Sequence, residues 1–137
     1  GTYTANLIAL SAARATLQIL DETEALTTIF DVGRRHRELL GRVFTHFSVE
    51  HTFAGPDSMF GVHFAETVPR SWRDWKQTDA PLYTAFCKQL IQRGVMLEPD
   101  SREPWFFCEA HRNVDLAWLE DVATQSMAAA LEGSTSA

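Results

Sequence analysis

Hydrophobic residues recur at intervals of three and four in four stretches of the chain, and this spacing predicts four helices. They run from Ala5 to Leu20, from about Glu24 to Phe47, from about Asp79 to Arg93 and from Asn113 to about Leu131. Asp79 and Asn113 are expected N-caps, because an Asp or Asn side chain can accept hydrogen bonds from the free N–H groups of a first turn. Asp115, in the first turn of the last helix, suits the positive end of the helix dipole.

The first two helices differ in how their apolar residues are distributed. The Ala5–Leu20 stretch is apolar on more than one side, which is typical of a buried helix, so a partner domain or subunit is expected to cover it. The Glu24–Phe47 stretch has one apolar face, and its opposite, charged face is interpreted as solvated. The charged residues of that face are Arg34, Arg35, Arg37, Glu38 and Arg42.

Four short stretches alternate between apolar and polar residues or are bounded by turn residues, and they predict strands. These are Glu50–Ala54, Ser58–Ala65, Val95–Glu98 and Trp105–Glu109. The Glu66–Thr78 stretch has no clean period but contains two tryptophans. It is interpreted as an ordered excursion, with one helical turn, that packs on another part of the protein.

The order of these elements predicts an α+β fold, in which a three- or four-stranded, mostly antiparallel sheet is covered by helices on one face. Residues 1–22 are expected to form a linking helix, residues 23–132 a small α+β domain, and residues 133–137 a flexible tail. Residue 1 is Gly and the helical pattern starts almost at once. The chain is therefore expected to be part of a longer protein or a trimmed one.

Composition narrows the class of protein. The chain has 137 residues, a formal net charge of −6 and 45% hydrophobic residues, which favours one globular domain. Acidic residues outnumber basic ones 18 to 12 and no basic stripe is present, so nucleic-acid binding is not expected. No apolar run approaches the ~20 residues of a membrane span, and no signal-peptide pattern is present. The chain has two cysteines, which excludes a disulfide framework and favours a reducing, cytoplasmic location.

Candidate chemistry is sparse. No two histidines have the spacing of metal ligands, so no metal site is expected, and His36 is interpreted as a packed or capping residue. No catalytic residue is expected in this chain. The two cysteines, Cys87 and Cys108, are interpreted as buried structural thiols. Carboxylates gather around the last two predicted strands, beside the aromatic run Trp105–Phe107, where they suit either substrate contact or an exposed turn. These carboxylates are Glu98, Asp100, Glu103 and Glu109.

The first residues offer a candidate anion site. Gly1–Thr4 consists of a glycine and hydroxyl residues immediately before a helix, and free N–H groups with a hydroxyl can hold a phosphate. A threonine in this place also serves as an ordinary N-cap.

Four motifs then follow one another along the chain. They are Gly1–Asn6 before an alanine-rich helix, Gly55–Phe64 with its Ser-Met-Phe, Arg93–Pro99 with its Gly-Val, and Ala110-His111 followed by a helix with Asp115 near its start. This ordered set resembles the last third of class III pyridoxal-phosphate (PLP) aminotransferases. Within that family it is most similar to glutamate-1-semialdehyde 2,1-aminomutase and its relatives.

The resemblance implies the small C-terminal domain of a fold-type I PLP enzyme, in a homodimer, with an N-terminal large domain as a further partner. PLP would be the cofactor, and an amino acid or amine the substrate. In that family the threonine of a Gly-Thr pair binds the cofactor phosphate of the neighbouring subunit, so the resemblance assigns cofactor binding to Gly1 and Thr2. The Schiff-base lysine lies upstream of this pair, and neither Lys76 nor Lys88, the two lysines of this chain, matches it.

The same resemblance points to two substrate-binding residues, Glu103 and Trp105. Glu103 matches a glutamate in a Ser-x-Phe-Glu-x-Gly-Phe pattern of the aminomutases, and Trp105 stands at the glycine of that pattern. Arg102 replaces the aromatic residue, and Cys108 stands where a serine is usual. The change from glycine to tryptophan is expected to shrink or reshape the pocket.

Two functions remain open from the sequence. The first is amino-group transfer by a PLP-dependent aminotransferase or aminomutase of which this chain is the C-terminal part. Because the lysine is missing, the isolated chain is expected to be inactive. The alternative is a non-catalytic α+β module for binding or dimerisation.

Overall fold

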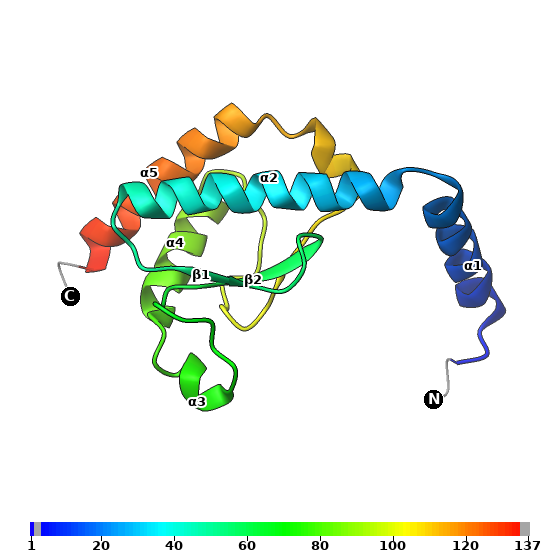
Figure 1. The fold of residues 1–137 in the computed structure, drawn as a ribbon, viewed down its shortest axis with the longest axis horizontal. Helices are drawn as coiled ribbons and strands as arrows, with labels where there is room; N and C mark the ends of the chain where they lie inside the picture. Colours follow the sequence, from blue (N-terminus) through cyan, green and yellow to red (C-terminus); the bar gives the residue numbers. More distant parts are fainter. Residues whose placement is uncertain (2–3, 135–137) are drawn as a thin grey trace.

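The computed structural model describes residue 1 and residues 4–134. Its helices and strands follow the predicted order except toward the C-terminal end (Figure 1). In chain order they are α1 (Leu7–Glu22), α2 (Ala25–His46), β1 (Thr52–Ala54), β2 (Met59–His63), α3 (Trp72–Trp75), α4 (Ala80–Gln92), β3 (Trp105–Phe106), the 3-10 helix η1 (Glu109–Asn113) and α5 (Leu116–Ser134).

The three strands form one antiparallel sheet in the order β1-β2-β3. Phe53 in β1 pairs with Val62 in β2, and Phe60 in β2 pairs with Trp105 in β3. Helix α5 packs on both α2 and α4, and the three helices enclose the core together with the sheet. The predicted α+β fold and its small antiparallel sheet are therefore confirmed.

Aromatic rings from the sheet and the helices make up much of the core. Phe44 of α2 is fully buried, and its ring centre lies 5.0 Å from that of Phe64 and 5.4 Å from that of Phe86, both in edge-on contacts. Phe60 is also fully buried. Edge-on aromatic pairs add about 0.5–1.5 kcal/mol beyond the area that they bury, so this cluster joins the sheet firmly to α2 and α4.

A close contact between α2 and the turn that joins β1 to β2 fixes the position of the sheet. A Cβ atom added at Gly33 would lie 1.7 Å from the backbone oxygen of Asp57, so only glycine permits this approach. Arg37 donates to the backbone oxygen of Gly55 at 2.7 Å and pairs with the Asp57 carboxylate at 3.0 Å. Its guanidinium lies 4.8 Å from the centre of the Phe60 ring. The predicted solvated face is thus wrong for Arg37, which is half-buried.

The predicted strand Val95–Glu98 is wrong. Within the described part of the chain, this segment is an extended loop that pairs with no strand. Val95 and Leu97 pack against the core, whereas Met96 is 97% exposed. Half-burial of an extended segment produces the same alternation as a strand, which explains the error.

The predicted strand Trp105–Glu109 is shorter than expected, and the last helix starts later. β3 has two residues, because the chain turns into η1 with Cys108 as its N-cap. Asn113 is the last residue of η1 and does not cap the final helix. That cap is Asp115, whose carboxylate accepts a hydrogen bond from the backbone N–H of Ala117 at 2.9 Å.

Helix α1 stands apart from the other elements and has no buried residue (Figure 1). Its N-cap is Asn6, whose side chain accepts from the N–H groups of Ile8 and Ala9. The predicted helix is confirmed, and its apolar side chains lie open in this chain. The large exposed ones are Leu7, Ile8, Leu10, Leu17 and Ile19. No helix in the described residues has the length and apolar character needed to cross a bilayer.

Candidate functional site

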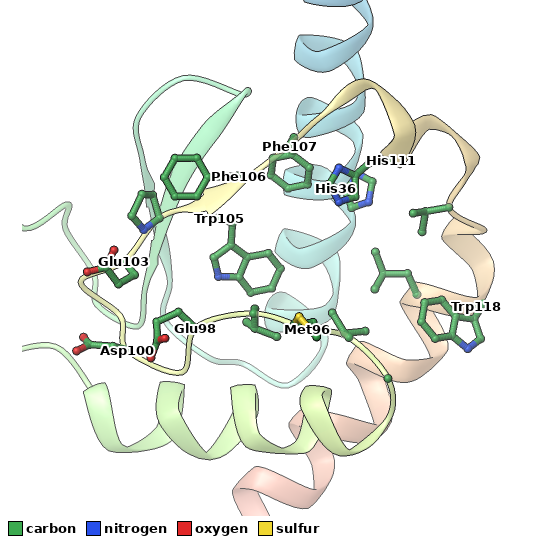
Figure 2. Close-up of a pocket in the computed structure, with 16 residues that line it drawn as sticks. His36, Met96, Glu98, Asp100, Glu103, Trp105, Phe106, Phe107, His111 and Trp118 are labelled. Atoms are coloured by element: carbon green, nitrogen blue, oxygen red, sulfur yellow. The ribbon is translucent and has the colours of Figure 1, made fainter. Parts of the chain in front are cut away.

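A cavity of about 820 Å³ lies between the loop after α4, the turn before β3, η1 and the start of α5 (Figure 2). Both predicted substrate-binding residues, Glu103 and Trp105, line it. The other lining residues are His36, Gly94, Val95, Met96, Leu97, Glu98, Asp100, Pro104, Phe106, Phe107, His111, Val114, Trp118 and Leu119. A mostly apolar cavity with a few polar groups is the usual form of a small-molecule site.

Trp105 lines this cavity between the carboxylates at one end and the imidazoles at the other (Figure 2). The indole Nε1–H donates to the hydroxyl of Tyr83 at 2.9 Å. Tyr83 belongs to α4 and is fully buried, and burial raises the pKa of its hydroxyl. The indole also stacks on Phe60, with ring centres 6.5 Å apart. Helix α4 and the sheet therefore hold the ring in place.

Three of the four carboxylates that the sequence brought together line one end of the cavity: Glu98, Asp100 and Glu103. Arg102 makes hydrogen bonds and an ion pair with Asp100 and holds the pKa of that carboxyl at about 2. Glu103 lies in the turn that the sequence predicted, with its N–H donating to the backbone oxygen of Asp100 at 3.0 Å. Glu109 does not line the cavity.

Two imidazoles line the other end of the cavity, His36 from α2 and His111 from η1 (Figure 2). Their ring centres lie 6.4 Å apart. His36 Nδ1 lies 2.7 Å from the backbone oxygen of Val32, and burial lowers the pKa of this histidine. His36 is thus a packed residue, as predicted, and a wall of the cavity as well.

The two cysteines have different environments. Cys87 of α4 is fully buried, as expected, and burial raises the pKa of its thiol to about 12. Cys108 is exposed, so its predicted burial is wrong. Its Sγ lies 3.2 Å from His111 Nδ1, and its position at the start of η1 turns the side chain out of the core.

The predicted cofactor-binding residues lie at the other end of the chain. Thr2 is outside the described residues. Gly1 is exposed, and its backbone oxygen accepts hydrogen bonds from the N–H and hydroxyl of Thr4 at 3.2 and 2.8 Å. Lys76 and Lys88 are exposed, and neither lines the cavity. The described residues include no group of three or more His, Cys, Asp or Glu side chains that could hold a metal ion.

Sequence reasoning did not find all of the cavity. Tyr83, which anchors Trp105, and His36 lie on helices whose pattern indicates only that they face inward. Trp118 of α5 also lines the cavity, and its position in a helical pattern gives no sign of this. His111 had one signal, since it belongs to the Ala110-His111 motif that carries the family resemblance.

Comparison with known proteins gave relatives with one recurring name, although no family model matches the chain. It is 32% identical over 117 residues to the glutamate-1-semialdehyde 2,1-aminomutase of Thermus thermophilus, covering 85% of this chain and 28% of that protein. The enzyme of the same name from Chlamydia caviae is 26% identical over 133 residues, covering 97% of this chain and 30% of that protein. The chain therefore spans less than a third of the length of the curated relatives that it matches.

Solved structures give the same result for the fold. The PLP internal aldimine form of the FumI protein of Sphingopyxis sp. matches 91% of this chain and 27% of its own length, at a TM-score of 0.74 and 24% identity. A transaminase with PLP bound matches 97% and 30%, at a TM-score of 0.72 and 20% identity. The resemblance read from the motifs is confirmed: the chain is similar over most of its length to one part of the glutamate-1-semialdehyde 2,1-aminomutases and has the fold of a part of PLP-dependent transaminases.

Proposed function

We propose that this chain is the C-terminal part of a PLP-dependent aminotransferase or aminomutase that acts in the cytoplasm as a homodimer. The observation that carries the proposal is the match to relatives that share one name, which covers 85% of this chain but 28% of the Thermus thermophilus protein. An N-terminal large domain would supply the remaining length, including the lysine that holds PLP. The cofactor would supply an electron sink for amino-group transfer, and this chain would supply part of the substrate-binding surface.

The decisive experiment is to sequence the DNA upstream of the codon for Gly1. We expect an open reading frame for a large α/β domain that contains a lysine suited to PLP. A start codon immediately before Gly1 would support the alternative of a free-standing α+β binding or dimerisation module. The isolated chain should also fail to turn over amino donors when PLP is added, because Lys76 and Lys88 are exposed outside the cavity. An absorbance spectrum with stoichiometric bound cofactor, together with turnover, would contradict this part of the proposal.

Helix α1 would link the two domains, and its exposed apolar side chains would dock on the large domain. Leu7 is 78% exposed and Ile8 is 82% exposed. Burial of such a side chain against the large domain would stabilise the intact protein by about 1.5–3 kcal/mol. Hydrogen exchange of the intact protein should show protected amides along α1. In the isolated chain the same amides should exchange faster than those of α2.

Gly1 and Thr2 would contact the cofactor phosphate across the dimer interface. In the intact protein, Thr2→Ala should weaken PLP affinity by about 10- to 150-fold, which corresponds to one hydrogen bond to a charged group. An unchanged affinity for PLP would contradict a contact between Thr2 and the cofactor phosphate.

Glu103 and Trp105 would select the substrate. Both line the cavity, and the fold of the chain is that of a part of PLP-dependent transaminases. A carboxylate at this place favours an amine or another polar group and disfavours a second carboxylate. In the intact protein, Glu103→Gln should change kcat/KM unequally among amines of different charge. If all substrates change by the same factor, Glu103 has no selective role.

A further inference from the structure

The polar groups that line the cavity are unevenly distributed by charge. Glu98, Asp100 and Glu103 line one end, while no Lys or Arg is among the described lining residues. Asp100 is neutralised by its ion pair with Arg102, which binds it through two nitrogens. Glu98 and Glu103 make no ion pair in the described part of the chain, although the Arg102 guanidinium also attracts the Glu103 carboxylate. Three carboxylates against one guanidinium leave this end of the cavity with a net charge of −2.

Aromatic rings stand beside these carboxylates. Trp105, Phe106 and Trp118 all line the cavity (Figure 2). Phe106 is 67% exposed and Trp118 is 44% exposed, although both are large and apolar. Carboxylates and aromatic faces both attract cations, and exposed apolar surface in a concave site favours an apolar ligand body.

The opposite end offers a pair of hydrogen-bonding groups. His36 is only 6% exposed, and its Nδ1 must donate to the backbone oxygen of Val32, which leaves Nε2 as a bare acceptor. His111 Nδ1 lies 2.9 Å from the backbone nitrogen of Cys108, which can only donate, and 3.2 Å from the backbone oxygen of the same residue. The shorter contact favours Nδ1 as the acceptor, with a proton on Nε2. The two imidazoles therefore present one acceptor and one donor, which a hydroxyl group can satisfy together.

We propose that the cavity binds an elongated ligand that has an apolar or aromatic body, a lasting positive charge at one end and a hydroxyl or similar neutral group at the other. The positive charge would lie between Glu98 and Glu103 against the aromatic wall, and the neutral group would lie at His36 and His111. This proposal rests on the proposed function in taking the cavity as a substrate-selecting surface. The positive charge is additional to the amino group that the enzyme transfers, so it sets which amines are accepted.

Binding can be measured without catalysis. Three probes of similar size are titrated into the 137-residue chain and followed by tryptophan fluorescence: benzyltrimethylammonium, benzyl alcohol and phenylacetate. The first carries a permanent charge and has no transferable amino group, so its binding is independent of amino-group transfer. A cooperative thermal melt of each protein sample establishes that it is folded. We expect the cation to bind at least fivefold more tightly than the neutral probe, and the anion to bind most weakly.

Variants then test which carboxylates bind the positive charge of the probe. Glu98→Gln and Glu103→Gln should each weaken the cation by about two- to fivefold, as for partly exposed charge pairs, and leave benzyl alcohol unchanged. The control Glu50→Gln removes the same charge from an exposed residue that does not line the cavity, and it should change nothing. Equal affinities for the cation and the neutral probe, or equal effects of all three variants, would overturn the proposal. A missing upstream domain would overturn the proposed function instead, and this binding result would stand.

Discussion

The hydrogen bond between Trp105 and Tyr83 allows a direct test of what holds the cavity wall in place. Trp105→Phe keeps an aromatic ring but removes the indole N–H, and so leaves the buried Tyr83 hydroxyl without the donor that lies 2.9 Å from it. Loss of a partner for a buried polar group costs about 1–3 kcal/mol. Some ring area is lost in addition, so we expect the free energy of unfolding to fall by about 2–3 kcal/mol. For a chain of this size, each kilocalorie lowers the melting temperature by roughly 2–4 °C.

A variant of Tyr83 separates the contribution of the hydrogen bond to stability from that of the indole ring. Tyr83→Phe removes the hydroxyl, and the double variant removes both groups, so that neither is left unsatisfied. The double variant should therefore lose about 1 kcal/mol less than the sum of the two single variants. Urea unfolding followed by circular dichroism measures all four proteins under one set of conditions. A coupling energy within about 0.3 kcal/mol of zero would refute the structural role given to this contact.

The same variants show whether Trp105 only supports the cavity wall or also contacts the substrate. If Trp105 acts only as an anchor, the intact protein with Trp105→Phe should keep its rank order of substrates while its melting temperature falls. If the indole itself contacts substrate, the rank order should change. Tyr83→Phe serves as the comparison, because it removes the same hydrogen bond but leaves the indole in the cavity. A rank order that changes in Trp105→Phe and not in Tyr83→Phe assigns the effect to the indole itself.

Three further outcomes follow from the structure. Burial lowers the pKa of His63 from 6.5, so the folded state favours its neutral form, and the free energy of unfolding should fall as pH drops from 7.5 to 5, less steeply in His63→Asn. Gly33→Ala should cost at least about 2 kcal/mol by urea unfolding because its Cβ would meet a backbone oxygen, whereas Gly41→Ala in the same helix meets only ordinary contacts and should be neutral or stabilising. Asp115→Ala should lower stability by about 1 kcal/mol, and Asn113→Ala by less than half of that, since only the first caps α5. Equal losses within either of the last two pairs would contradict the structure.

The long helices could be predicted from the sequence because their signals are local. For α4, Asp79 accepts a hydrogen bond from the N–H of Leu82 at 2.9 Å, as expected of an N-cap, and Pro81 lies in the first turn where its missing N–H costs nothing. The strands were harder to predict, because a strand depends on a neighbour that can be far away in the sequence. Alternation reports that one side of an extended segment is buried, but a strand also needs a neighbour. Val95–Glu98 has the alternation without the neighbour.

The carboxylate end of the cavity was predictable for the same local reason. Glu98, Asp100, Glu103 and Trp105 lie within eight positions of one another in the sequence, so a single turn brings them to one place. The residue that fixes Trp105 could not be found in this way. Tyr83 is 22 positions away on a helix, where its pattern indicates an inward-facing side chain but not the partner of its hydroxyl.

The imidazole end depends on packing that periodicity does not describe. The apolar stripe of α2 faces inward along its length, yet part of it meets the core and part of it, at His36, meets the cavity. The close approach of the β1–β2 turn at Gly33 brings Phe107 near the same point: an added Cβ would lie 3.4 Å from the Phe107 ring, and that ring lies 5.0 Å from His36. A side chain at position 33 would therefore push apart both the turn and the wall beside His36. The glycine that positions the sheet thus also shapes this end of the cavity, which is why its ligand preference could be inferred only once the fold was known.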